Sequence, residues 1–149
     1  MRFTATFLAL AATTSATLQA VQNQCHESVW LTFANATKTT APEELSSGEA
    51  YVTNLNGTGN SLGVTKNEGD YQSTDGYKLI LGSSLADALL YWTITRVNGD
   101  PFAKESFSCN VTGADPATLG QNATTYEPGL VKVAQDPQDN LTLTLWLCP

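Results

Sequence analysis

Four side chains of the types most often used for covalent chemistry stand out in this sequence: three cysteines, Cys25, Cys109 and Cys148, and a single histidine, His26. In an oxidising compartment three cysteines are expected to form one disulfide and leave one thiol, and three pairings are open. A thiol nucleophile needs a neighbouring base, and His26 is the only imidazole in the chain. One histidine is also too few for a catalytic zinc site without further ligands. These residues predict a structural disulfide and neither a catalytic thiol nor a metal centre.

Acidic residues gather at Glu68, Asp70 and Asp75, beside two glycines. Such a segment could form a calcium loop or supply a pair of carboxylates for acid–base chemistry. Calcium takes about six to eight oxygen ligands, and the spacing here is not that of a known calcium loop. We therefore interpret the segment as a solvated turn and expect no metal and no cofactor. The remaining acids of this region are scattered and are interpreted in the same way: Asp87, Asp100 and Glu105.

The overall charge excludes further classes of function. The 149 residues include 7 Lys and Arg against 14 Asp and Glu, for a net charge of −7, and the basic residues form no cluster. A surface of this sign repels nucleic-acid phosphates. The sequence also contains neither a Gly-X-Ser-X-Gly elbow nor a glycine-rich phosphate loop. We therefore expect no nucleic-acid partner and no serine hydrolase.

The first residues read as a secretory leader. Arg2 gives a short positive region, Phe3 to Ala12 are mostly apolar, and small residues follow, with cleavage expected after Ala16 or, alternatively, after Ala20. The apolar stretch is shorter than the roughly 20 residues that span a bilayer, and no later segment resembles a membrane anchor. We expect a signal peptide over 1–16, one domain over 17–149, a secreted product and no membrane partner.

Five Asn-X-Ser/Thr sequons follow this leader. In an exported chain they can carry N-linked glycans, which would place each asparagine on a surface loop or a strand edge. The five candidate glycosylation sites are Asn35, Asn56, Asn110, Asn122 and Asn140. Together they predict a eukaryotic glycoprotein.

The hydrophobic periodicity is that of β-strands. The clearest case is the C-terminal segment, in which Leu141, Leu143, Leu145 and Leu147 alternate with mostly polar residues. Turn-forming residues separate the other candidate strands, which are 18–23, 29–33, 49–55, 62–66, 77–81, 89–97, 106–111 and 130–134. About nine short strands in one small domain predict an all-β sandwich.

Two segments depart from this strand pattern. Residues 83–90 could form a short helix with Ser84 as its cap, and 112–129 are expected to form a long surface loop. Trp30 and Trp92 lie within apolar strands and are expected in the core. Trp146 points away from the leucine face of the last strand, so it is the one aromatic side chain proposed for ligand contact.

The two ends of the chain carry a specific pattern. Asn23, Cys25, Val29 and Trp30 form an N-x-C-x-x-x-V-W motif, and the last strand ends in Cys148-Pro149. In these motifs the chain resembles small thaumatin-like proteins, and through Asn98 to Ala103 it is similar to the fungal branch known as the yeast-phase-specific secreted protein family. The resemblance implies a sandwich of about ten strands, a Cys25–Cys148 disulfide and cleavage after Ala16. Cys109 would then remain as a buried thiol or as a link between chains.

The resemblance also implies where an acidic cleft would lie. In thaumatin-like proteins with antifungal or β-glucan activity, carboxylates line a cleft, and glycoside hydrolysis needs two of them. Aligned through Val97-Asn98-Gly99, two of these aspartates become Asn98 and Thr93, and 77–81 contain no acid. Asparagine and threonine cannot donate or accept a proton near neutral pH as a carboxyl group does.

The sequence therefore predicts a secreted, non-enzymatic glycoprotein of the cell wall or the host interface. Its expected partner is a cell-wall glycan or a host protein, and it is expected to be a monomer unless Cys109 links two chains. The alternative is a β-glucan hydrolase whose carboxylates have moved to Asp70, Asp75 or Asp87.

Overall fold

A computed structural model describes residues 16–113, 122–136 and 140–149. These residues form eleven β-strands and one short 3₁₀ turn, η1, over Glu68–Tyr71. The strands are β1 Leu18–Asn23, β2 Val29–Ala34, β3 Glu43–Leu45, β4 Ala50–Asn54, β5 Asn60–Thr65, β6 Lys78–Ala86, β7 Leu89–Val97, β8 Phe107–Thr112, β9 Asn122–Ala123, β10 Lys132–Gln135 and β11 Thr142–Leu147. The predicted leader over 1–16 lies outside the described residues except for Ala16.

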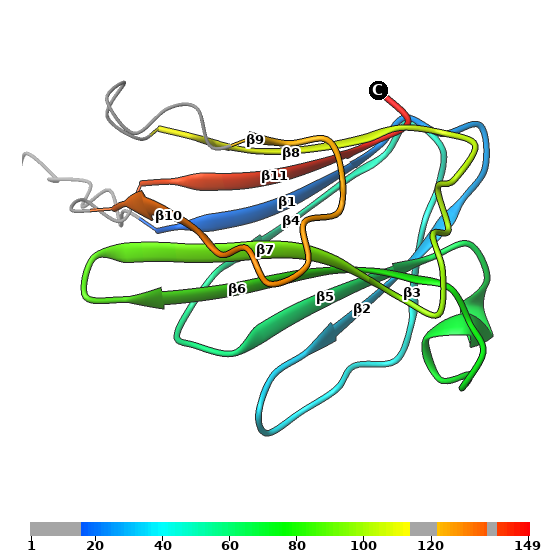
Figure 1. Cartoon of the computed structure of the whole chain (residues 1–149), viewed down its shortest axis with the longest axis horizontal. Helices are drawn as coiled ribbons and strands as arrows, with labels where there is room; N and C mark the ends of the chain where they lie inside the picture. The colour runs from blue at the N-terminus through cyan, green and yellow to red at the C-terminus, as the bar shows by residue number, and fades with distance from the viewer. Residues whose placement is uncertain (1–15, 114–121, 137–139) are drawn as a thin grey trace, which may run out of the picture.

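The strands form two facing sheets in one domain, so the expected all-β thaumatin-like sandwich is confirmed (Figure 1). One sheet has five strands in the order β4-β1-β11-β8-β9, and the other has six in the order β10-β7-β6-β5-β2-β3. The first and last strands, β1 and β11, are parallel neighbours in the five-stranded sheet. Because the two strands are parallel, their C-terminal ends lie side by side. Cys25 comes two residues after β1, and Cys148 comes directly after β11.

The core lies between the sheets and is built by the alternation that the sequence shows. On β11 the leucines face inward and are fully buried. They meet inward residues of the six-stranded sheet, among them Leu81, Leu90 and Trp92, each at most 1% exposed. Because side chains alternate along a strand, the polar residues between the leucines face outward.

The inward face of β1 is partly polar. Leu18 and Ala20 lie on the outer face, whereas Gln19 and Asn23 point inward and are at most 3% exposed. The Gln19 carbonyl oxygen accepts a hydrogen bond from the buried hydroxyl of Ser83, at 3.4 Å. Burying a polar group is costly unless it is hydrogen-bonded, so β1 depends on this contact as well as on packing, while Gln19 Nε2 has no partner among the described residues.

The short helix considered for 83–90 is wrong. This segment is the β6–β7 hairpin, and only Asp87 and Ala88 separate its paired ends, Ala86 and Leu89. Asp87 and Ala88 have φ values of 53° and 56°. A two-residue hairpin of this kind needs positive φ at both turn positions, as in a type I′ turn, and the usual sequence signal for it is Asn-Gly or Asp-Gly.

Two further expectations differ from the structure. Of the expected loop over 112–129, residues 114–121 lie outside the described residues, and Asn122–Ala123 form β9, which pairs with β8. Trp30 was expected in the core, but it lies on the outer face of β2, half-buried, because Val29 and Leu31 on either side of it face inward. Trp92 is in the core as expected, at 1% exposure.

The outer face of the six-stranded sheet is partly covered by η1. The Tyr71 ring lies directly against Gly63 on β5, where an added Cβ would come within 2.1 Å of the ring. Only glycine permits this close approach. Figure 1 shows no helix or strand of the described chain lying over the outer face of the five-stranded sheet.

Candidate functional site

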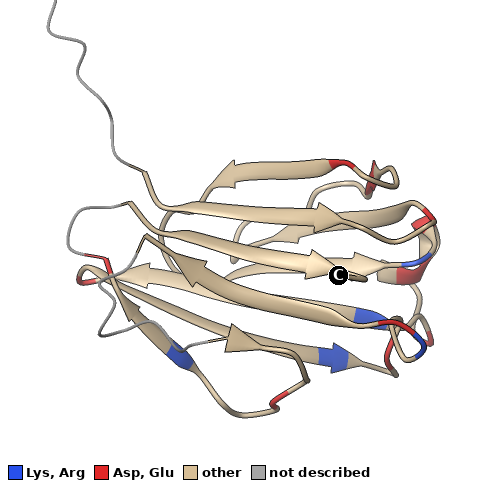
Figure 2. Cartoon of the chain, turned by 90° about the horizontal axis from the view of Figure 1, so that it is seen from above, with Lys and Arg blue, Asp and Glu red and all other residues tan. Residues whose placement is uncertain are grey.

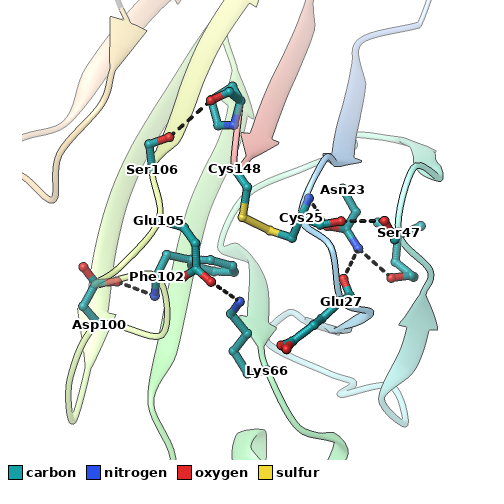
Figure 3. Close-up of a disulfide and its surroundings, with 12 residues drawn as sticks. Asn23, Cys25, Glu27, Ser47, Lys66, Asp100, Phe102, Glu105, Ser106 and Cys148 are labelled. Carbon is teal, nitrogen blue, oxygen red and sulfur yellow. Dashed lines mark hydrogen bonds and ion pairs between the residues drawn. A yellow bond between two sulfur atoms is a disulfide. The ribbon is translucent and has the colours of Figure 1, made fainter.

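The two terminal cysteines form a disulfide, as the family resemblance implied. Cys25 and Cys148 are bonded across a sequence separation of 123 residues, with their Cα atoms 4.9 Å apart (Figure 3). The Asn23 side chain supports this corner of the molecule. Its Oδ1 accepts a hydrogen bond from the Cys25 N–H, and its Nδ2 donates to the carbonyls of Glu27 and Leu45. The asparagine of the N-x-C motif therefore fixes the backbone that presents Cys25.

A pocket of about 400 Å³ lies beside this disulfide. Two of its charged groups form an ion pair: Lys66 Nζ is 3.0 Å from Glu105 Oε1 and lies 5.0 Å from the centroid of the Phe102 ring (Figure 3). The lining residues are Gln24, Cys25, His26, Glu27, Lys66, Glu105, Ser106 and Cys148. The two cysteines are oxidised, and Ser106 Oγ donates to the Pro149 carbonyl at 3.4 Å. We interpret this pocket as part of the structural support around the disulfide.

At the two positions where the resemblance implied acidic cleft residues, the side chains of Asn98 and Thr93 form structural hydrogen bonds. Asn98 follows β7 with a φ of 62°, and its Nδ2 donates to the carbonyls of Thr74 and Gly76, at 2.5 and 3.1 Å. Thr93 Oγ1 donates to the Leu130 carbonyl at 2.9 Å. Both side chains hold neighbouring loops in place. An aspartate at position 98 could not make the two donations of Asn98, because a carboxylate has no N–H.

Asn98→Asp is therefore expected to lower the free energy of unfolding by about 1–3 kcal/mol, since two carbonyls lose their donor and face a negative charge instead. Chemical denaturation at neutral pH measures the loss. Asn56→Asp, a change of the same chemistry in an exposed loop, is the matched control and should shift stability by less than about 0.5 kcal/mol. Equal stability of the two variants would contradict this role for Asn98.

The three carboxylates of the alternative hydrolase, Asp70, Asp75 and Asp87, do not lie together. Asp70 and Asp75 line a pocket of about 280 Å³ together with Asp100, whereas Asp87 lies at the β6–β7 turn, at the opposite end of β6. Nine residues of β6 span roughly 30 Å, well beyond the separation of about 5–10 Å that glycosidase carboxylates need.

Two of the three carboxylates in that pocket already have protein partners. Asp70 Oδ2 accepts from Asn67 Nδ2 at 2.9 Å. Asp100 Oδ1 accepts from the Phe102 N–H at 2.8 Å and from the Tyr126 hydroxyl at 2.6 Å. Burial and the hydrogen bond to Asp100 raise the pKa of Tyr126, so the phenol stays protonated and donates. No cluster of three or more metal-ligating side chains occurs among the described residues.

Cys109 is a free thiol on the inner face of β8 and is fully buried. Burial raises the pKa of this thiol, which keeps it protonated and unreactive. Of the two states that the sequence left open, the structure thus has the buried thiol.

In the native protein Cys109 is therefore expected to react with iodoacetamide at least about 100-fold more slowly than in the unfolded chain, because reaction requires opening of the core. Mass spectrometry of alkylated samples measures both rates. Rapid native labelling, or a disulfide-linked dimer through Cys109, would contradict the buried position.

The outward side of the five-stranded sheet, which we call the outer face, is an uncharged surface built by the described strands. Its outward side chains are Leu18, Ala20, Gln22, Ala50, Val52, Asn54, Ser108, Asn110, Thr112, Asn122, Thr142, Thr144 and Trp146. None of them is charged. Figure 2 looks down on this side and shows β1, β8 and β11 without acidic or basic residues along their lengths.

Trp146 lies near one end of this outer face, on the central strand β11. It is half-buried and pairs in register with Gln22 on β1 and Ser108 on β8. The next outward residue along β11 is Thr144, which has Asn110 beside it. An indole ring is thus bordered by amide and hydroxyl groups. The outward direction predicted for Trp146 is confirmed. Its neighbours on β1 and β8 could not be predicted from the sequence.

The predicted glycosylation sites fall in two kinds of position. Asn35, Asn56, Asn122 and Asn140 are exposed, in loops or on the edge strand β9. Asn110 is half-buried in β8, paired with Asn122 on one side and Thr144 on the other. Its Oδ1 is buried and has no hydrogen-bond partner among the described residues. Asn110 is therefore neither in a loop nor on a strand edge, and a glycan there would cover part of the outer face.

No helix in the described part of the chain is long and apolar enough to cross a membrane. A family model described as Blastomyces yeast-phase-specific protein matches residues 6–149. A comparison with curated proteins finds no match.

Seventeen solved chains match this structure. The protein elicitor MoHrip2 from Magnaporthe oryzae superposes with a TM-score of 0.67 at 18% identity, over 90% of this chain and 100% of that one. The thaumatin-like xylanase inhibitor TLXI superposes with a TM-score of 0.59 at 12% identity, over 88% of this chain and 99% of that one. At these identities the likeness shows a shared fold.

Proposed function

The chain belongs to the Blastomyces yeast-phase-specific protein family, and on this premise we propose that it is a secreted, non-enzymatic glycoprotein that binds a neutral glycan at the cell wall or the host interface. The observation that carries the proposal is the uncharged outer face with Trp146 on its central strand. The glycan is the partner that this chemistry fits best, and a host protein is the other outcome of the test.

The chemistry of the outer face favours a neutral sugar polymer. One side of an indole ring can pack against the C–H face of a sugar, in the way that aromatic side chains pack against apolar surface. The amides of Gln22 and Asn54 and the hydroxyls of Ser108 and Thr144 can donate to and accept from sugar hydroxyls. With no cation on this face and a net charge of −7, the protein offers nothing to attract an acidic polymer.

Two observations favour binding without hydrolysis. The positions that correspond to family acids are Asn98 and Thr93, and both side chains are used in structural hydrogen bonds. On the outer face there is no carboxylate at all, so a glycan bound there would meet neither a general acid nor a nucleophile.

The solved structures with a similar fold also favour a non-enzymatic role. One is described as a protein elicitor and the other as a xylanase inhibitor, and neither description names a catalytic activity. The leader over 1–16, the Cys25–Cys148 disulfide and the sequons are consistent with an exported glycoprotein.

The proposal is tested by sedimentation with insoluble β-glucan and chitin. The native protein is expected to pellet with at least one of them, and Trp146→Ala is expected to weaken that binding roughly tenfold or more. Trp30→Ala is the matched control, because it removes a half-buried indole from the outer face of the other sheet. Protein made without N-glycans shows whether a glycan at Asn110 or Asn122 covers the site.

Failure of the native protein to bind either polymer, with or without its own glycans, would refute the glycan proposal. Equal losses in Trp146→Ala and Trp30→Ala would refute the assignment to the outer face. Release of reducing sugar from laminarin that is abolished by Asp70→Asn and Asp75→Asn would instead establish the hydrolase.

A further inference from the structure

Asp136 is a buried carboxylate that has no ion-pair partner among the described residues. It lies just after β10 and is 1% exposed. Its oxygens accept hydrogen bonds from the Thr17 hydroxyl and from the Asn140 N–H, the latter at 2.9 Å. The ion pairs among the described residues join other side chains, Lys66 with Glu105 and Lys132 with Glu127. A carboxylate removed from water in this way is costly unless a positive charge and hydrogen bonds compensate it.

The residue that contacts Asp136 is held firmly at the start of the first strand. Thr17 is 2% exposed, and its carbonyl accepts from the Leu55 N–H at 2.8 Å. The next residue, Leu18, donates its N–H to the Leu141 carbonyl at 2.8 Å. Thr17 is therefore fixed between two strands of the five-stranded sheet, and its hydroxyl is directed at Asp136. The amide nitrogen of Thr17 is attached to the carbon next to the one that bears this hydroxyl.

We propose that removal of the leader after Ala16 converts this nitrogen into the ammonium group that neutralises Asp136. A signal peptidase hydrolyses the Ala16–Thr17 peptide bond with one water molecule, leaving a carboxylate on Ala16 and an amine on Thr17. The amine takes up a proton from solvent, since a free α-amino group has a pKa of about 7.7–8.0. Maturation thus supplies the missing cation, and the precursor lacks it.

The pairing of β1 favours a mature chain that begins at Thr17 over one that begins at Val21. Leu18, Gln19 and Ala20 each pair with β11 on one side and with β4 on the other. Cleavage after Ala20 would remove half of this strand and also Thr17. Cleavage after Ala16 keeps the whole strand and creates the new terminus next to the buried carboxylate.

The first test is the N-terminus of the secreted protein, read by intact mass and terminal sequencing after deglycosylation. The proposal expects Thr17 as the first residue. A start at Val21, or at any residue ahead of Thr17, would overturn it.

The second test is a cycle of four recombinant proteins with intact disulfides: chains beginning at Thr17 or at Ala16, each with Asp136 or with Asp136→Asn. One added residue moves the ammonium by about 3.8 Å. The added Ala16 is expected to lower Tm by roughly 10 °C when Asp136 is present and by less than about 2 °C in Asp136→Asn. The same shift in both backgrounds, or no shift in either, would overturn the proposal. Asp87→Asn, at an exposed turn, is the control for loss of a carboxylate.

A separate readout covers the case in which Asp136→Asn does not fold. The α-amine of the chain beginning at Thr17 is expected to be acylated at least about tenfold more slowly in the folded protein than in denaturant, because the ammonium is buried against Asp136. Equal rates in the two states would overturn the proposal.

Discussion

Replacing Cys25 and Cys148 together by serine is expected to lower the free energy of unfolding by about 4 kcal/mol. The disulfide closes a loop of 123 residues, and in the chain-entropy model a loop of about 100 residues contributes roughly 4.7 kcal/mol. A domain of this size has a total stability of about 5–15 kcal/mol, so the variant is left near the threshold of folding. Urea denaturation of both proteins measures the difference.

The control for this prediction is Cys109→Ala, which leaves the disulfide intact and removes the buried thiol. It is expected to cost about 1 kcal/mol, as a small truncation in the core does. If the double serine variant were as stable as Cys109→Ala, the disulfide would not be what holds the ends of β1 and β11 together.

Leu145→Ala is expected to destabilise the protein by about 3–4 kcal/mol. Leu145 is fully buried on the central strand of the five-stranded sheet and pairs in register with Val21 and Cys109. Both neighbouring strands hold it in place, so the site cannot collapse freely, and truncation leaves a cavity in addition to the lost transfer free energy. Thermal and urea unfolding both report the change.

The matched control lies one position earlier on the same strand. Thr144 faces the outer surface, so Thr144→Ala is expected to change the free energy of unfolding by less than about 1 kcal/mol. Because a slip of one residue would exchange the two faces, this pair of variants also tests the register of β11. A larger loss in Thr144→Ala than in Leu145→Ala would contradict it.

Much of the fold could be predicted because the strands that form it carry their own signal. The alternation from Leu141 to Leu147 marks β11 and its buried face, and the range expected for β7 is the range observed. These strand patterns are local in the sequence, so no knowledge of partners was needed. The pair Cys25 and Cys148 was implied by the family resemblance of the terminal motifs, since the residues alone left three pairings open.

The segments that were predicted incorrectly depend on long-range partners or on unusual turn chemistry. Asp87-Ala88 takes a turn conformation that Asn-Gly would normally mark. The inward face of β1 carries Gln19 and Asn23 beside Val21, and the partner of the Gln19 carbonyl, Ser83, lies far along the chain. The strands β3 and β9, of three and two residues, are too short to show a period of two.

In the candidate site, too, the local features could be predicted and the long-range ones could not. The outward direction of Trp146 follows from the alternation of β11. The uncharged surface around it arises from the strand order, which places β1 and β8 on either side of β11. Strand order likewise puts the sequon residue Asn110 in the interior of a sheet. The contact between Thr17 and Asp136 joins residues 119 positions apart, and no sequence pattern predicts it.

The central claim, that the outer face binds a neutral glycan, is tested most directly by mapping the ligand. A ¹⁵N-labelled sample would be titrated with soluble β-1,3-glucan oligosaccharides, or with chitin oligosaccharides if sedimentation favours chitin, and the amide shifts followed by NMR. We expect shifts confined to the strands of the outer face, β4, β1, β11 and β8, together with the indole N–H of Trp146. Shifts around Asp70, Asp75 and Asp100, or around the pocket beside the disulfide, would contradict it.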